Sequence, residues 1–183
     1  MLNLYALERG RFGALGVWAV AGAVLPDVPN GLFFAYHRIV AGMDSAAIYA
    51  ELYPQAQWQT VLAPWHSVWL VVVIALLARW RRHDGLLVLA ASVGLHLVAD
   101  LLTHGVDAHP HLWPLPWRFT SPVSYWDRAH FAAVFVPLEL VAVVASSWAI
   151  WRRGDSIWRR LLLVGASGWL VLAYGLGWVF WGT

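Results

Sequence analysis

Residues 85–105 read GLLVLAASVGLHLVADLLTHG, a stretch long and apolar enough to form a helix that crosses a membrane. Within it His96, Asp100 and His104 follow one another at intervals of four residues, so they line up on one face of an α-helix. Ionisable groups in such a stretch are costly unless they pair, bind a metal or line a wet cavity. The stretch therefore predicts a helical membrane protein with a polar site inside it.

Composition supports a membrane protein. The chain has 183 residues, of which 61% are hydrophobic and 12% are charged, whereas a soluble domain usually carries about 25% charged residues. Many of its 14 tryptophans stand beside the ends of apolar segments, as in the aromatic belts of membrane proteins. The chain has no cysteine, so a metal would have to be held by nitrogen and oxygen ligands.

Five apolar segments predict an all-α, polytopic bundle of about five transmembrane helices in a single domain, 1–183. The first segment also resembles a cleavable signal peptide, because Arg9 and Arg11 precede its apolar run, and this alternative stays open. We expect a surface helix in the first outer loop and an irregular, proline-rich lip over the site in the second. The expected spans are 12–27, 61–80, 86–103, 129–151 and 161–181, and the outer loops are 31–60 and 105–128.

The arginines predict the orientation. All twelve basic residues are arginine, and they form short clusters, so we expect no nucleic-acid partner. Five spans would put nine of them on one side and three on the other, which predicts a cytoplasmic N-terminus. On this map every histidine except His83 falls on the outer side, which suggests one site facing outside. The smaller set of arginines is Arg38, Arg118 and Arg128.

The residue types near the outer side are those of a metal site. Neutral imidazole and carboxylate are the ligands of catalytic zinc and related ions. One helix face supplies His96 and Asp100, and neighbouring spans could add Asp27 and His66. We therefore expect a bound divalent metal, zinc before other ions. The predicted ligands are Asp27, His66, His96 and Asp100, with His37 or His104 as auxiliary ligands.

Structural explanations of the same residues remain open. His96 and Asp100 could form a buried hydrogen-bonded pair that joins helices, and His104 could be an interfacial residue at the helix exit. Asp27, after a proline, could turn the chain or cap the next segment. His66 could hydrogen-bond within the first turn of the second span.

Four other polar positions are less informative. We expect His109 and His111 to be solvated loop residues. Glu139, in the middle of the fourth segment, could pair with an arginine, bind a polar neighbour or transfer a proton, and the sequence does not choose among these. His130 and Glu139 are nine residues apart, so they are not expected to share a site.

The order of the polar motifs resembles that of the bacterial membrane-bound metal-dependent hydrolase family often called YdjM-like. The resemblance covers roughly residues 20–120, and its most specific part is the HxxxD helix followed by a Trp-Pro loop. The family is in turn distantly similar to zinc-dependent phospholipases C and single-strand nucleases. The matching motifs are Leu25-Pro26-Asp27, His37-Arg38, His66-Ser67, His96-Leu97-Val98-Ala99-Asp100, Leu112-Trp113-Pro114-Leu115 and Arg118-Phe119.

The resemblance implies a hydrolase of phosphoesters in the bacterial inner membrane, and the substrate could be a lipid that reaches the site laterally. Asp27, His66, His96 and Asp100 match the family's metal ligands, and His37 matches less closely. The chain departs from the family pattern at Asn30, where a second acidic residue is common, at Trp65, which replaces a threonine, and in the long spacer between His37 and His66.

The catalytic roles follow from this picture. Asp27, His66 and Asp100 would bind or serve the metal centre, and Arg118 or Arg38 would stabilise negative charge on the phosphate. A non-catalytic metal-binding or structural membrane protein is the first alternative. A transporter or proton relay is the second, although the spans on the cytoplasmic side of Glu139 are nearly free of polar groups.

Overall fold

The computed structural model describes residues 16–105, 108–124, 128–153, 164–165 and 168. Every regular element in these ranges is a helix, which confirms the all-α prediction. The elements in chain order are α2 (Gly16–Val24), α3 (Asp27–Ala35), η2 (Tyr36–Val40), α4 (Ser45–Ala47), η3 (Ile48–Leu52), α5 (Ala56–Leu62), η4 (Ala63–His66), α6 (Val68–Arg81), α7 (Asp84–Thr103), η5 (Arg128–His130) and α8 (Ala132–Arg153).

The predicted span 86–103 is α7, an unbroken helix of 20 residues. At 1.5 Å per residue it extends over about 30 Å, the thickness of a bilayer's hydrocarbon core. Among the described helices, α7 alone is long and apolar enough to cross a membrane by itself. Two bent pairs of helices raise the number of candidate membrane spans to three if each pair is counted as one span.

The first bent pair is α2 with α3 and η2, which meet at an angle of 53°. Pro26 stands at the bend, where its missing N–H and its ring prevent the helix from continuing straight. The segment expected at 12–27 therefore continues beyond Pro26, and residues 12–15 lie outside the described part. The bend makes Asp27 the first residue of α3, where the helix dipole favours a carboxylate.

The second bent pair is α5 and η4 with α6, bent by 45°. Ser67 has an extended backbone at the break, and its hydroxyl donates a hydrogen bond of 2.7 Å to the carbonyl of Pro64. His66 is the last residue before this break. Both bends thus place a polar side chain where the regular helix is interrupted.

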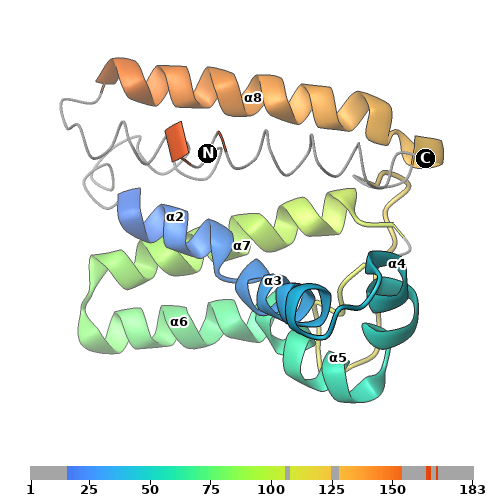
Figure 1. Ribbon diagram of the computed structural model, residues 1–183. Helices are drawn as coiled ribbons and strands as arrows, with labels where there is room; N and C mark the ends of the chain where they lie inside the picture. The colour runs from blue at the N-terminus through green and yellow to red at the C-terminus, as the bar shows by residue number, and fades with distance from the viewer. Residues whose placement is uncertain (1–15, 106–107, 125–127, 154–163, 166–167, 169–183) are drawn as a thin grey trace.

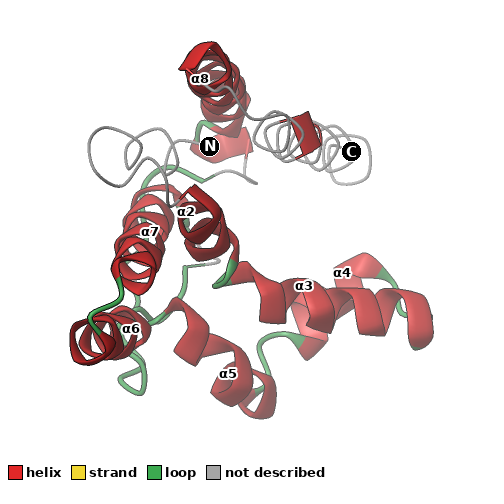
Figure 2. Ribbon diagram, turned by 90° about the vertical axis from the view of Figure 1, so that its left-hand side faces the viewer, coloured by secondary structure: helices red, strands yellow, loops and turns green. Residues whose placement is uncertain are grey.

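The core of the bundle consists of α2 and α6 packed against α7 (Figures 1 and 2). Small residues let α2 approach α7 closely, as is common between membrane helices. A Cβ atom on Gly22 would lie 2.6 Å from the carbonyl oxygen of Leu89. At the same contact the hydroxyl of Ser92 donates a hydrogen bond of 2.6 Å to the carbonyl of Ala19.

The helices α6 and α7 form an antiparallel hairpin with its turn at Arg82 and His83. Arg82 adopts the left-handed conformation that ends α6, and the Nδ1 atom of His83 accepts a hydrogen bond from the backbone N–H of Leu86. His66 and Asp100 are each 17 residues from His83. The hairpin therefore carries both to the same level, far from the arginines at the turn.

The segment 31–60 is mostly helical, so its assignment as an outer loop with one short surface helix was incomplete. It contains most of α3, all of η2, α4 and η3, and the start of α5. These helices enclose a small core of Phe33, Ile48 and Leu62, with Tyr53 and Trp58 packed against it. The segment folds into helices because its aromatic and aliphatic residues suffice to form a core. Asp44 also caps α4, since its side chain accepts a hydrogen bond from the backbone N–H of Ala46.

The remaining predicted segments differ in how far the structure describes them. Within 105–128 the described residues are irregular up to η5, as its prolines predict. The segment expected at 129–151 corresponds to η5 and α8. The predicted fifth span, 161–181, lies outside the described residues except for 164–165 and 168.

Candidate metal centre

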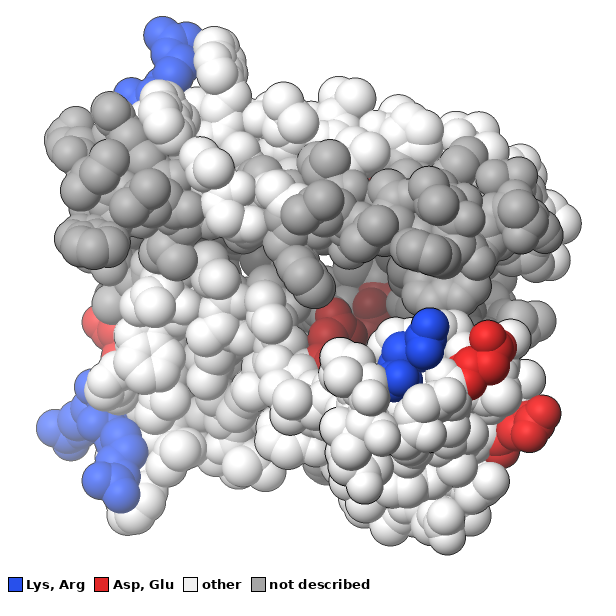
Figure 3. All heavy atoms as spheres, in the orientation of Figure 1, with Lys and Arg blue, Asp and Glu red and all other residues white. Residues whose placement is uncertain are grey.

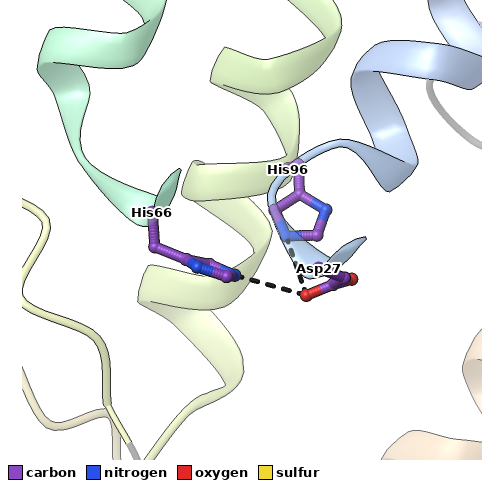
Figure 4. A group of neighbouring side chains, drawn as sticks. All are labelled: Asp27, His66 and His96. Atoms are coloured by element: carbon purple, nitrogen blue, oxygen red, sulfur yellow. Dashed lines mark hydrogen bonds and ion pairs between the residues drawn. The ribbon is translucent and has the colours of Figure 1, made fainter. Parts of the chain in front are cut away.

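Four predicted ligands from three parts of the chain meet at one point. Figure 4 shows three of them, Asp27, His66 and His96. The Nε2 atom of His66 lies 3.2 Å from Oδ1 of Asp27 and 3.7 Å from Oδ2 of Asp100. The Nε2 atom of His96 lies 3.7 Å and 3.2 Å from the same two oxygens. We call Asp27, His66, His96 and Asp100 the Asp/His cluster. Each imidazole contacts both carboxylates, so the four ligand atoms form a closed ring.

These distances have the scale of a metal coordination sphere. Bonds of roughly 2.0–2.1 Å to a tetrahedral zinc ion place neighbouring ligand atoms about 3.3 Å apart. The four distances in the cluster range from 3.2 to 3.7 Å. Asp27, His66 and His96 thus form a group that could hold a metal ion, and so do His66, Asp100 and His109.

Hydrogen bonding within the cluster leaves Nε2 of His96 and Oδ2 of Asp100 without a hydrogen-bond partner. The Nδ1 atom of His96 donates to the carbonyl of Ala23 at 2.9 Å, which leaves Nε2 with its lone pair. Although Nε2 of His96 and Oδ2 of Asp100 are 3.2 Å apart, both are buried and neither makes a well-directed hydrogen bond. Burying such a group without a partner costs about 1–3 kcal/mol. A shared cation between them would satisfy both atoms.

The cluster is open on one side only. The side chain of His66 is 1% exposed and that of Asp100 10%, whereas that of Asp27 is 60% exposed. Figure 3 shows acidic side chains in a hollow of this face of the molecule, with blue arginine groups at the left-hand corners of the molecule and beside the hollow. Solvent can therefore reach an ion in the cluster from the side of Asp27, and access for water is one requirement of a catalytic metal site.

His104, predicted as an auxiliary ligand, lies at the edge of the cluster. Its Nε2 atom is 3.6 Å from Oδ1 of Asp100, the carboxylate oxygen that the other two histidines do not contact. The hydroxyl of Ser121 donates a hydrogen bond of 2.6 Å to the carbonyl of Leu102, and the N–H of Ser121 donates one of 2.9 Å to the carbonyl of His104. The loop therefore holds the end of α7 in place.

The expectation that His109 and His111 are solvated was wrong, because both are buried. His109 stacks on His66 with ring centroids 3.9 Å apart. The Nδ1 atom of His111 donates a hydrogen bond to the carbonyl of His66, and the backbone carbonyl of His111 accepts one from the N–H of Val68, both at 2.9 Å. The break between η4 and α6 frees these backbone groups, and the loop satisfies them by folding back over the cluster. The sequence signal was the pair of histidines around Pro110, close behind His104.

Burial sets the protonation of these two loop histidines. It lowers the pKa of His109 well below the ordinary value, and the imidazole of His66 lowers it further. It also lowers the pKa of His111, although the hydrogen bond to His66 opposes this. Both rings are therefore neutral at neutral pH, and neutral imidazole is the form that binds metals.

Three predicted functional residues lie apart from the ligand atoms. His37 donates from Nδ1 to the carbonyl of Phe33 at 2.8 Å and packs against the rings of Phe33 and Trp58. Neither potential metal group among the described residues includes it. Arg118 donates to the carbonyl of Ala108 at 2.6 Å and to Gln59 at 3.0 Å, so it braces the loop beside His109. Arg38 is exposed on η2.

No family model, curated protein or solved structure matches the chain.

Proposed function

We propose that this chain is a membrane-bound, metal-dependent hydrolase that acts on a phosphoester at the extracytoplasmic surface of a bacterial inner membrane. The observation that carries the proposal is the ring of four ligand atoms in the Asp/His cluster, 3.2–3.7 Å apart and open at Asp27. The YdjM-like order of motifs favours the same reaction class. Zinc is the proposed ion, because imidazole and carboxylate side chains are among its usual ligands.

The chain's own residues have distinct parts in this proposal. A bound divalent metal would supply a water of lowered pKa and an electrophile for an anionic oxygen. His66 and His96 would hold the ion on the buried side. Asp27 contacts both histidines through Oδ1, so its Oδ2 is the group at the open side that can accept a proton from an attacking water. Arg118 would act by keeping the loop against the cluster.

A closed, non-catalytic metal site is the main alternative. The exposure of Asp27 favours the hydrolase, because an ion in the cluster could be reached by water and substrate from that side. The proton-relay alternative has less support, since the polar groups of the cluster gather near one end of α7, while α6 consists of apolar residues down to its arginines.

The topology in this proposal is five spans with a cytoplasmic N-terminus. It is supported by the arginine-bearing ends of α6 and α8, which lie at the same end of the molecule in Figure 1, away from His66. Because the chain has no cysteine, single-cysteine variants can test this with a membrane-impermeant maleimide on intact cells. We expect Ala46→Cys to be labelled from outside and Asp84→Cys only after permeabilisation. The reverse pattern would contradict the orientation.

The function itself is tested with the full-length protein, purified in detergent without chelator. Elemental analysis should find bound zinc, and bis(p-nitrophenyl) phosphate or phospholipid vesicles should be hydrolysed. Asp27→Asn, which keeps the size of the side chain but removes its charge, should lower both bound metal and hydrolysis. His83→Asn at the opposite end of α7 is the matched control. Absence of metal would refute the centre, and bound metal without hydrolysis would support the non-catalytic alternative.

A further inference from the structure

Helices α3 and η2 leave an apolar side exposed. Leu32 is 66% exposed and Ile39 78%, whereas Phe33 is 7% exposed and lies in the small core. The exposed apolar residues recur every three or four positions, the spacing of one side of a helix. Single exposed apolar residues need no explanation, but a continuous row of them marks a contact with a protein or a membrane. We call this row the apolar stripe, and it consists of Val28, Leu32, Tyr36, Ile39 and Val40.

The apolar stripe runs across the direction of the long helices. The pair α3 and η2 leaves α2 at an angle of 53°. Figure 2 shows α6 and α7 foreshortened, whereas α3 lies across the view and extends away from both. Because α7 is long enough to span a bilayer, a helix that crosses its direction in this way is oriented along the membrane plane.

The apolar stripe faces the level of α6 and α7 and not the outer end of the molecule. Phe33 packs with Ile48 of η3, so the opposite side of α3 faces away from η3. In Figure 1, α4, which directly precedes η3, lies further than α3 from the arginine-bearing ends of α6 and α8. Two exposed carboxylates, those of Asp44 and Glu51, belong to this outer part. The segment thus has an apolar side toward the long helices and acidic groups on the other side.

We propose that the apolar stripe lies in the outer leaflet of the bilayer that α7 spans, with α3 and η2 parallel to the membrane surface. Helices that lie in this way bury their apolar side about 5–10 Å into the boundary between headgroups and acyl chains. Tyr36 within the stripe suits this level, because its ring is apolar and its hydroxyl is polar. Arg38, exposed beside the stripe, can reach the headgroups. The inference rests on the membrane location in the proposed function, and on neither the metal nor the reaction.

This placement fixes the level at which the Asp/His cluster opens. Asp27 is the first residue of α3 and directly precedes the apolar stripe, and its exposed carboxylate forms the open side of the cluster. A helix that lies parallel to the membrane surface holds its first residue at the same level as the rest. The cluster therefore opens at the level of the lipid headgroups, and a ligand reaches it from the surface of the leaflet.

Spin labels can measure the depth of the apolar stripe without an activity assay. The chain has no cysteine, so an introduced cysteine carries the label at one chosen position. The full-length protein is placed in vesicles of phosphatidylethanolamine and phosphatidylglycerol. Electron paramagnetic resonance then compares access of oxygen, which concentrates among the acyl chains, with access of a water-soluble nickel chelate. The variants are Leu32→Cys and Ile39→Cys in the stripe, Val73→Cys in the middle of α6 and Ala46→Cys in α4.

We expect oxygen to reach the labels at Leu32 and Ile39 better than the nickel chelate does, at a depth of about 5–10 Å. The label at Val73 should lie deeper, and the label at Ala46 should be open to the chelate. All four positions are exposed, so the substitutions leave the packing of the core unchanged.

The outcomes separate this inference from the proposed function. If the chelate reaches both stripe labels while Val73 lies among acyl chains, the inference is overturned and the membrane hydrolase stands. If the chelate also reaches Val73, the membrane location itself is wrong. Stripe labels that neither reagent reaches, with dipolar broadening that disappears on dilution with unlabelled protein, would show that a second copy covers the stripe. That result would also overturn the contact with lipid.

Discussion

Two histidines, His37 and His96, make the same local hydrogen bond but have different surroundings. Each donates from Nδ1 to a backbone carbonyl, at 2.8 Å to Phe33 and at 2.9 Å to Ala23. The ring of His37 is then enclosed by aromatic rings, with centroids 4.5 Å away at Phe33 and 5.2 Å away at Trp58. The ring of His96 instead presents Nε2 to two carboxylates.

The difference shows that a hydrogen bond to a backbone carbonyl does not by itself distinguish a metal ligand from a core histidine. What distinguishes them is what the second nitrogen meets. In the aromatic surroundings of His37 the ring contributes packing and one hydrogen bond. In the Asp/His cluster the second nitrogen lies beside two carboxylate oxygens, with which it could hold a cation. The following predictions test this contrast.

The largest effect is expected at Asp100, the carboxylate shared by His66, His96 and His104. If about 12 kcal/mol of metal binding is shared among four ligands, the loss of one weakens binding about 100-fold. Asp100→Asn should therefore lower zinc affinity by this factor, measured by competition with a chelating dye. His83→Asn should bind as the wild type does. Equal affinity in all three proteins would show that the cluster is a hydrogen-bonded core.

His37→Ala tests the prediction that His37 is a core residue and not a metal ligand. It removes ring contacts with Phe33 and Trp58 and a buried hydrogen bond, so unfolding in detergent should become easier by about 2 kcal/mol. Zinc affinity should stay within about twofold of wild type, far from the loss expected for a ligand. If His37→Ala lowered zinc affinity as much as His96→Ala does in the same assay, His37 would be a metal ligand, and the distinction between His37 and His96 would be wrong.

Gly22 tests whether the packing of α2 on α7 holds Asp27 in the cluster. A Cβ atom there would lie 2.6 Å from the carbonyl oxygen of Leu89 and 2.7 Å from Cβ of Ser92, so the helices must move apart. Gly22→Ala should destabilise the protein by about 1.5 kcal/mol and weaken zinc binding through Asp27. Gly31→Ala in α3 is the matched control, because its Cβ meets no atom within 4 Å. Equal effects of Gly22→Ala and Gly31→Ala on stability and zinc binding would argue against tight packing of α2 on α7.

The smallest effect is expected at Ser92, whose hydroxyl donates to the carbonyl of Ala19. Hydrogen bonds between membrane helices contribute about 0.6 kcal/mol on average. Ser92→Ala should lower the free energy of unfolding by this amount and leave the zinc affinity of the cluster unchanged. A loss of several kcal/mol would mean that this contact holds α2 in place more strongly than Gly22 packing does.

Local spacing predicted part of the site. The interval of four residues placed His96 and Asp100 on one face of α7, and the helix confirms this. His104 follows the last residue of α7 and has an extended backbone, although its ring still lies beside Asp100. The meeting of His66 with Asp100 could also have been derived, because both are 17 residues from the turn at His83. The prediction failed at His109 and His111. Their position around Pro110, close behind His104, was a signal, but it does not show that the break before α6 needs hydrogen bonds from this segment.

The sequence by itself determined the helical class, the long apolar helix α7 and the polar face it carries, because each depends on the spacing of neighbouring residues. The tertiary structure decided which distant residues join that face. The bend at Pro26 brings Asp27 to it, while His37, ten residues further on, lies among aromatic rings. The return of the loop adds His109. These choices depend on bends and close packing between helices, which residue spacing along one helix does not specify.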